Sequence, residues 1–262
     1  MPIAARGFGA QSPTRRELLR LALLTLVGWG APTRLRAAAG GSHFTWTQLR
    51  YAGNWDPTPR AAARFLDQMR RRTSVEAGRT RRLIDPGDPA LYELPYLYVA
   101  GRGGFPRLGA EAETWLRRYL ENGGFVFFDD ATGIPESPYH DAVRDMLGRI
   151  LPGRPLQPLA AAHTVFQSFY LLREVPGRKL VRPFLYGIEV EDLTPVVFCA
   201  NDLGGAWDGD PLGGYTYPCT PGGERQRELS FRLGVNLVLY SLTGNYKKDQ
   251  VHIPFILKRR QR

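Results

Sequence analysis

Hydrophobic side chains in residues 43–245 switch repeatedly between the strand period of two and the helix period of 3.6. Residues 44–51 alternate between apolar and polar positions and predict a strand. After a turn, Thr58 is placed to cap a helix that has Pro59 in its first turn. The apolar residues of this helix recur at i, i+3, i+4 and i+7 and predict one buried face: Ala62, Phe65, Leu66 and Met69.

Further strands and helices alternate along the chain. Residues 94–100 form a nearly continuous apolar run, typical of a buried parallel strand, and residues 125–128 form another. A helix is predicted between them over residues 112–120, and a second helix is expected from Ser137-Pro138 to Ile150. Because strands and helices alternate in this way, the pattern predicts a layered α/β domain.

The carboxyl-terminal third continues the same pattern. Residues 180–190 and 195–200 are strand candidates, and the last strong helix is predicted over residues 224–242. A basic tail of uncertain order follows at residues 246–262. The length of residues 43–245 suits one domain with a full hydrophobic core, so we expect a single soluble domain there.

The first 39 residues have the three parts of an export signal. Arg15 and Arg16 precede the apolar run 21–29, and a small-residue stretch ends at Ala39. The arginine pair resembles the twin-arginine signal, which implies transport of the folded protein across a bacterial inner membrane. We therefore expect transient membrane contact through the signal, cleavage after Ala39 and a periplasmic protein. The alternative is an uncleaved helix that anchors the chain in the inner membrane, facing the periplasm.

Net charge argues against a nucleic-acid partner. The chain has 35 Lys and Arg against 25 Asp and Glu, a net charge of +10. Residues 1–39 contain six Arg and one Glu, so half of the excess belongs to the predicted signal. The remaining +5 is an ordinary solubility charge. Residues 70–82 and 258–260 are rich in arginine but lack interleaved aromatic residues, and we expect no nucleic-acid binding.

Cys199 and Cys219 are the only cysteines. An oxidising compartment would permit a disulfide between them. A buried free thiol is equally natural for Cys199, because it lies in the apolar run 195–200. Two cysteines at this spacing match no metal motif, and we expect neither a bound metal nor a cofactor.

Asp129 and Asp130 directly follow the predicted strand 125–128. Ligands of open α/β folds bind at the carboxyl edge of the sheet, where these carboxylates are expected to lie. Adjacent carboxylates in a poorly solvated crevice raise each other's pKa, so one would serve as a general base and the other as a metal ligand. Alternatively, one caps a turn or binds backbone amides while the other faces solvent.

The same edge is expected to receive two further groups. Gly101, Arg102 and Gly103 follow one predicted strand, and Arg102 would neutralise a carboxylate, receive an anionic ligand or remain exposed. Asn201 and Asp202 follow another strand and would either join the edge or form an Asx turn. All five residues are ligand-binding candidates. Carboxylates with an asparagine and a histidine would suit a hard divalent cation, although no recognised motif fixes one.

Several of these local patterns occur in a definite order: Leu49-Arg50-Tyr51 with Asn54-Trp55, Leu94-Pro95-Tyr96-Leu97-Tyr98 with Gly101-Arg102-Gly103, Leu116-Arg117-Arg118-Tyr119-Leu120 with Gly123-Gly124-Phe125, Asp129-Asp130, His163-Thr164-Val165-Phe166, and Asn201-Asp202-Leu203-Gly204 with Trp207. Together they resemble the bacterial domain-of-unknown-function family 4159 over residues 43–245. His163 is the histidine inside a family-like pattern, which makes it a better acid/base candidate than His140 or His252, although a structural role is the alternative.

The resemblance implies a fold without an established reaction. Members of the family are similar to the class I glutamine amidotransferases, which implies a flavodoxin-like three-layer α/β sandwich with a mainly parallel central sheet. In those enzymes a glycine-rich loop holds an oxyanion, as Gly101-Arg102-Gly103-Gly104 would here, and a later turn presents a nucleophilic cysteine. Residues 128–133 occupy the place of that turn and contain no cysteine. Glutaminase activity is therefore not expected.

Three hypotheses of function remain. The first, which we favour, is an exported non-catalytic binding domain for a partner protein or a small ligand. The second is a hydrolase that uses Asp129, Asp130 and His163, with or without a metal ion. The third is a structural subunit of the cell envelope that assembles through exposed aromatic surfaces.

Overall fold

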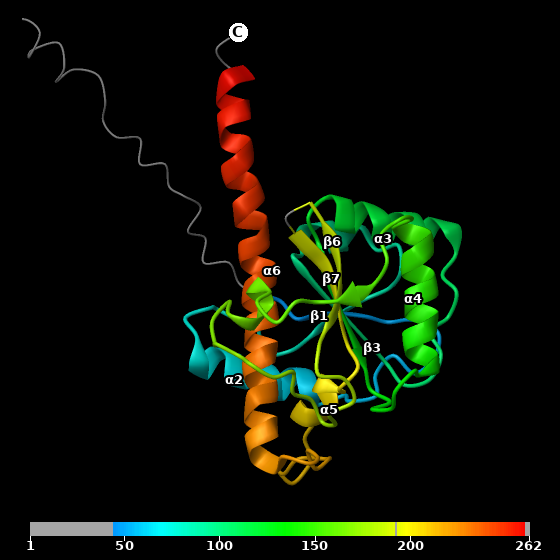
Figure 1. Cartoon of the computed structure of the whole chain (residues 1–262), viewed down its shortest axis with the longest axis vertical. Coiled ribbons are helices and arrows are strands. Elements are labelled where there is room, and N and C mark those ends of the chain that lie inside the picture. The colour runs from blue at the N-terminus through cyan, green and yellow to red at the C-terminus, as the bar shows by residue number, and fades with distance from the viewer. Residues whose placement is uncertain (1–43, 192, 260–262) are drawn as a thin grey trace, which may run out of the picture. The chain divides into compact units, whose positions relative to one another are not determined.

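The computed structural model describes residues 44–191 and 193–259, with side chains described as far as Thr243 (Figure 1). The chain divides into two units, Met1–Gly41 and Ser42–Arg262. The predicted export signal, with Arg15, Arg16 and the cleavage point after Ala39, lies outside the described residues. Within the described part, no helix combines the length and the apolar character needed to cross a membrane.

A seven-stranded sheet forms the centre of the second unit. Its strand order is β2-β1-β3-β4-β7-β6-β5. The strands are β1 Thr47–Leu49, β2 Arg82–Ile84, β3 Tyr96–Gly101, β4 Phe125–Asp130, β5 Gln157–Pro158, β6 Tyr186–Val190 and β7 Leu193–Cys199. Strands β2, β1, β3, β4 and β7 are parallel, whereas β6 and β5 pair antiparallel. The predicted α/β domain with a mainly parallel sheet is confirmed.

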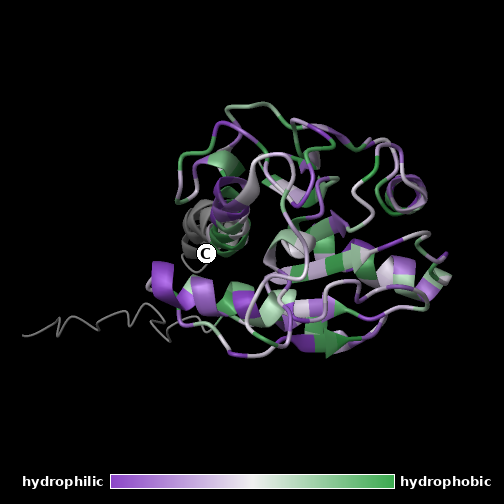
Figure 2. Cartoon of the chain, turned by 90° about the horizontal axis from the view of Figure 1, so that it is seen from below, coloured by the Kyte–Doolittle hydropathy of each residue, from purple (hydrophilic) through white to green (hydrophobic). Residues whose placement is uncertain are grey.

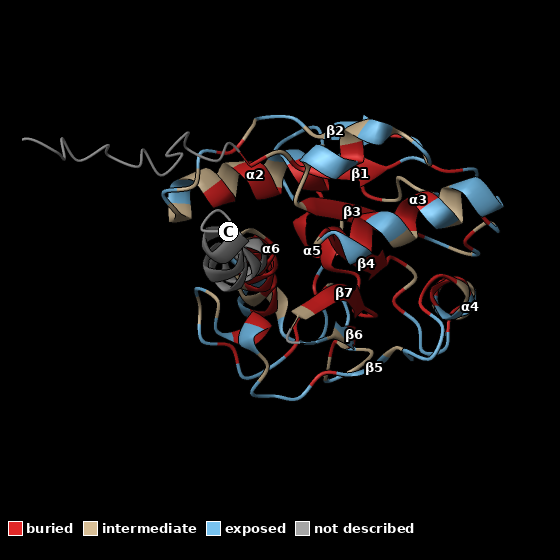
Figure 3. Ribbon diagram, turned by 90° about the horizontal axis from the view of Figure 1, so that it is seen from above, coloured by how far each residue is buried: buried red, intermediate tan, exposed pale blue. Residues whose placement is uncertain are grey.

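Helices cover both faces of the sheet and complete the three layers (Figure 3). On one face lie α2 Ala61–Arg72, α5 Leu203–Trp207 and α6 Gly223–Arg259, and on the other lie α3 Ala110–Glu121 and α4 Pro138–Ile150. The short 3-10 helices η1 Pro89–Glu93 and η2 Thr164–Phe166 lie in connections. Figure 2 shows hydrophobic residues concentrated in the strands and hydrophilic residues along exposed parts of the helices. The buried hydrophobic residues form two clusters, one on each face of the sheet.

Alternating side chains of the strands supply these two cores. In β4, Phe125 and Phe127 join the core under α2 and α6, while Val126 and Phe128 join the core under α3 and α4. This division follows from the strand period of two, which sends successive side chains to opposite faces. A continuous apolar run is therefore required in a strand that has both faces covered.

Some predicted boundaries are wrong. Helix α2 begins at Ala61, and Arg60 precedes it without a side-chain cap, so Thr58 is not the cap and instead is buried. The strand predicted over residues 180–190 is limited to β6. Helix α6 does not end at Leu242 but continues to Arg259, so most of the predicted basic tail is helical.

Cys199 and Cys219 are both buried free thiols, so the disulfide that an oxidising compartment would permit is absent. Cys199 is the last residue of β7 and lies in the core beneath α5 and α6. Burial raises the pKa of its thiol well above the ordinary value. A protonated thiol without solvent access is a poor nucleophile, which agrees with a packing role for this cysteine.

Candidate functional site

The carboxyl ends of β3, β4 and β7 meet at one edge of the sheet. In the parallel register, Gly101 pairs with Asp130, and Asp129 pairs with Cys199. Asn201 and Asp202 follow β7 directly. The edge therefore brings together the candidate residues that the sequence places after these three strands.

Asp129 is fully buried and holds the start of α5. Its carboxylate accepts hydrogen bonds from the backbone N–H groups of Leu203 (2.9 Å) and Gly204 (2.6 Å) and from the hydroxyl of Tyr98 (2.8 Å). Burial raises the pKa of Asp129, and the neighbouring charge of Asp202 adds to that rise, while the three hydrogen bonds oppose it. Both oxygens are thus engaged with donors of the protein.

Asp202 is also fully buried and caps the same short helix. It adopts a left-handed backbone conformation with φ 56°, and its side chain accepts from the N–H of Gly205 at 2.8 Å. Its second oxygen accepts from Nε of Arg178. Burial raises the pKa of Asp202, and the charge and hydrogen bond of Arg178 partly offset this effect.

Asp130 organises the turn between β4 and α4. It accepts from the N–H (2.9 Å) and hydroxyl (2.6 Å) of Thr132 and from the hydroxyl of Ser137. Ser137 in turn accepts from the N–H of His140 at 3.0 Å and caps α4. Burial raises the pKa of Asp130, although the hydrogen bonds from Ser137 and Thr132 oppose it. Neither strand-end carboxylate faces solvent, contrary to the expectation that one would.

Asn201 fixes the segment that precedes β6. Its Oδ1 accepts from the N–H groups of Val181 (2.9 Å) and Arg182 (2.8 Å). Its Nδ2 donates to the carbonyls of Val175 (2.9 Å) and Arg182 (2.8 Å). The side chain is buried and makes four hydrogen bonds, so residues 175–182 are tied across the end of β7. This tie explains why residues 180–185 do not extend the strand.

Gly101 and Arg102 have different roles after β3. A Cβ atom at Gly101 would lie 2.2 Å from the Tyr139 ring and 2.4 Å from the Tyr51 hydroxyl, so glycine is required there for packing. Arg102 is exposed, and its Nε donates to the carbonyl of Ala131 at 3.2 Å. Gly103 has φ +99°, a conformation that favours glycine in the turn. Among these three, Arg102 is the residue with polar atoms available to a ligand.

His163 lies at the opposite edge of the sheet. Its Nε2 is 2.8 Å from the hydroxyl oxygen of Thr194, near the start of β7, and its Nδ1 accepts from Val165 N–H at 3.2 Å. Thr194 precedes Cys199 by five residues, which is roughly 17 Å along a strand. Burial lowers the pKa of His163. The structure therefore does not bring His163 together with Asp129 and Asp130.

Three residues near this edge were not predicted from the sequence: Arg178, Lys179 and Tyr217. Together with Arg102 they form a group that we call the rim. The guanidinium carbons of Arg178 and Arg102 lie 5.3 Å and 5.9 Å from the centre of the Tyr217 ring. A Cβ atom built on Gly133 would lie 2.9 Å from Nη2 of Arg178 and 3.3 Å from Cδ of Lys179. The rim thus gathers around the turn after β4.

The first turns of α6 hold the rim in position. Nε2 of Gln226 donates to the carbonyls of Gly177 (2.7 Å), Arg178 (3.2 Å) and Thr220 (3.0 Å). The buried Arg227 donates to the carbonyl of Tyr217 at 2.8 Å. Segments far apart in the sequence are therefore fixed to one helix. No local sequence pattern signals these contacts, because they join residues 6 to 49 positions apart.

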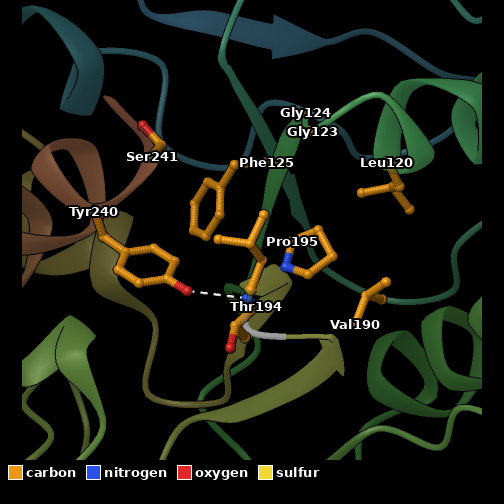
Figure 4. A pocket seen from close by; sticks show the side chains of 10 residues that line it. Leu120, Gly123, Gly124, Phe125, Val190, Thr194, Pro195, Tyr240 and Ser241 are labelled. Atoms are coloured by element: carbon orange, nitrogen blue, oxygen red, sulfur yellow. Dashed lines mark hydrogen bonds between the residues drawn. The ribbon is translucent and has the colours of Figure 1, made fainter. Parts of the chain in front are cut away.

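A pocket at the amino edge of the sheet is too small for a ligand (Figure 4). It lies between the starts of β4 and β7 and the side chain of Tyr240 in α6, whose hydroxyl accepts from Thr194 N–H at 2.9 Å. Its cavity volume of about 20 Å³ offers space on the scale of one water molecule.

The described residues contain no group of three His, Cys, Asp or Glu side chains arranged to hold a metal ion. The carboxylates at the strand ends instead face backbone amides, hydroxyls and Arg178. These partners occupy the oxygen atoms that a hard cation would require.

Comparison with known proteins places the chain in a family. No curated protein matches it. The model of the family described as "Domain of unknown function (DUF4159)" matches residues 45–242, which agrees with the resemblance over residues 43–245. Since the match covers most of the chain, the protein belongs to the DUF4159 family.

Proposed function

We propose that the protein is a non-catalytic binding domain that holds a partner or a small ligand at the carboxyl edge of its sheet. The relation to the glutamine amidotransferase fold is part of the proposal. Strand order β2-β1-β3-β4-β7 supports it, because flavodoxin-like domains arrange five parallel strands in the order 2-1-3-4-5 and bind ligands at the carboxyl edge.

The observation that carries the proposal is that the candidate reactive groups are buried and bonded to other groups of the protein. Asp129 and Asp130 are buried, and protein donors occupy their oxygens. The turn over residues 128–133 lacks a cysteine, and Cys199 is enclosed in the core. A general base or nucleophile must reach its substrate within hydrogen-bonding distance. These groups instead support the rim, in which Arg102 and Lys179 are exposed and Arg178 and Tyr217 are partly buried.

No observation favours the two alternatives. A hydrolase would need His163 beside the carboxylates, but the histidine binds Thr194 at the other edge. An envelope subunit would need an assembly surface of exposed aromatic residues; Trp46 and Trp207 are fully buried, and the exposed aromatic residues Tyr92, Phe169 and Tyr215 come from separate segments of the chain. The binding hypothesis is the one that the contacts at the strand ends support.

Export to the periplasm also belongs to the proposal. It rests on Arg15, Arg16 and the small-residue stretch ending at Ala39. The intact mass of protein recovered from the periplasmic fraction tests it directly. A chain that begins at Gly40 supports the proposal, whereas a full-length chain that remains with the inner membrane contradicts cleavage and favours the anchored alternative.

Native mass spectrometry of protein purified from its own envelope fraction tests the binding function. Wild type is compared with Asp130→Asn, which alters the buried turn, and Arg102→Gln, which alters the rim. A mass retained by wild type and Asp130→Asn but reduced in Arg102→Gln supports binding at the rim. A mass lost only in Asp130→Asn, with circular dichroism unchanged, would place the site at the carboxylate and contradict the proposal.

A further inference from the structure

We infer that the rim binds an oxyanion of a small molecule, of the phosphate or carboxylate type, between the guanidinium groups of Arg102 and Arg178. This inference rests on the proposed binding function and names the chemical class of its ligand. It is carried by the positions of the two arginines, by the donors that they leave free, and by the local distribution of charge.

The two arginines contact the same turn and the same aromatic ring. Arg102 donates its Nε to the carbonyl of Ala131, and Nη2 of Arg178 packs against Gly133 in the same turn. Both guanidinium groups also lie within 6 Å of the centre of the Tyr217 ring. Shared contacts with one turn and one aromatic ring place both cations at the same part of the sheet edge, and the ring stabilises each guanidinium.

Each arginine donates a hydrogen bond to the protein through Nε and leaves its Nη groups free. Arg178 donates Nε to Asp202, and Arg102 donates Nε to Ala131. Among the described residues, no hydrogen-bond acceptor contacts the Nη atoms of either side chain. A planar guanidinium with free Nη groups matches the oxygen atoms of a carboxylate or phosphate group.

The charges around the turn leave the rim positive toward solvent. Lys179 brings a third cation against Gly133, and no carboxylate pairs with Lys179 or Arg102 within the described part of the chain. The nearby acids, Asp129 and Asp202, are buried, and Arg178 already pairs with Asp202. Three cations with one buried counterion, Asp202, leave an excess of positive charge, and a bound anion would balance it.

One further acid near the rim does not change this distribution. Glu136 is 83% exposed at its side chain and lies 3.7 Å from Arg182, a contact expected to contribute little in water. Its partner is Arg182 rather than a member of the rim. The cations of the rim therefore lie nearer the solvent, and the acids Asp129 and Asp202 lie buried beneath them.

Isothermal titration calorimetry of the purified protein tests the inference, with inorganic phosphate and succinate as separate probes at constant ionic strength. Arg102→Gln removes one rim cation from an exposed loop. Arg118→Gln removes an equally exposed arginine on α3 and serves as the matched control. Loss of a charge-assisted contact is expected to weaken binding about tenfold or more in Arg102→Gln and to leave the control unchanged.

Saturable binding of either probe with this pattern supports the inference, and the tighter probe tells a phosphate ligand from a carboxylate ligand. No saturable binding of either probe, or equal weakening in both variants, overturns it. The proposed function fails separately. If the envelope-purified protein retains a ligand through the rim but neither oxyanion binds, the binding function stands and only the ligand class is wrong.

Discussion

Replacement of Asp129 by asparagine tests whether this buried acid is a structural support. The carboxylate accepts from two backbone N–H groups and one hydroxyl, and α5 begins at these amides. Asparagine keeps the shape and one acceptor oxygen, but its NH₂ group would face a backbone donor. We expect the N–H of Leu203 or Gly204 to lose its partner.

The magnitude follows from that lost partner. Leaving a buried donor unsatisfied costs about 1–3 kcal/mol. The substitution also removes a buried charge, with its desolvation cost and its repulsion of Asp202, and this offsets part of the loss. We therefore expect Asp129→Asn to lower the free energy of unfolding by about 1–3 kcal/mol near neutral pH. Asp145→Asn, an exposed position on α4, is the matched control and should change stability by less than about 0.5 kcal/mol.

Urea denaturation followed by circular dichroism measures both variants. A stability loss confined to Asp129→Asn supports the structural role. Equal stability of the two variants would show that the carboxylate contacts contribute nothing. A gain in stability for Asp129→Asn would refute the reasoning outright, because groups that are retained for activity at the expense of stability give that result.

Three further predictions follow from the site. Burial raises the pKa values of Asp129 and Asp202 above the ordinary 3.8, so the unfolding free energy should fall as pH rises from about 4 through those raised pKa values; urea titrations across pH measure it, and a slope that Asp129→Asn leaves unchanged would contradict it. Gly101→Ala places a methyl group within 2.2 Å of Tyr139 and should destabilise the fold by about 1–3 kcal/mol in thermal unfolding, whereas a neutral result would mean that the ring moves freely. His163→Gln should leave ligand retention in native mass spectra unchanged, and a lost ligand would return this histidine to the site.

Much of the fold could be predicted from hydrophobic periodicity. Strands β3 and β4 and helices α3 and α4 have long patterns that match their burial, and their predicted ranges agree with the structure to within about two residues. Strands β2 and β5 contain three and two residues, and helix α5 contains five, so none is long enough to show a period.

The polar residues of the edge were predictable because parallel strands place their carboxyl ends together. This logic gave Asp129, Asp130, Asn201 and Asp202. Their partners were not predictable, since Asp129 binds Leu203 and Gly204 across more than 70 positions of the chain. Burial decides whether such acids are reactive or structural, and periodicity does not report it for polar residues at strand ends.

The location of His163 could not be predicted from the sequence. Its position in an irregular segment gave no indication of the sheet edge that it would face. The structure places it beside Thr194, at the start of β7, because the chain leaves β5 beside Leu185, just before β6, and reaches the start of β7 within a few residues. Membership of a family-like sequence pattern therefore did not indicate where this histidine lies relative to the strand-end carboxylates.

Stoichiometry of ligand depletion tests the central claim most directly, because it separates binding from catalysis. Purified wild-type protein is incubated with a small-molecule extract of the envelope fraction, and the extract is measured by mass spectrometry before and after removal of the protein. The account predicts that a compound is depleted in proportion to the protein and is recovered unchanged when the protein is denatured. A compound consumed in large excess over the protein, with a new product and with loss of that turnover in Asp130→Asn, would contradict it.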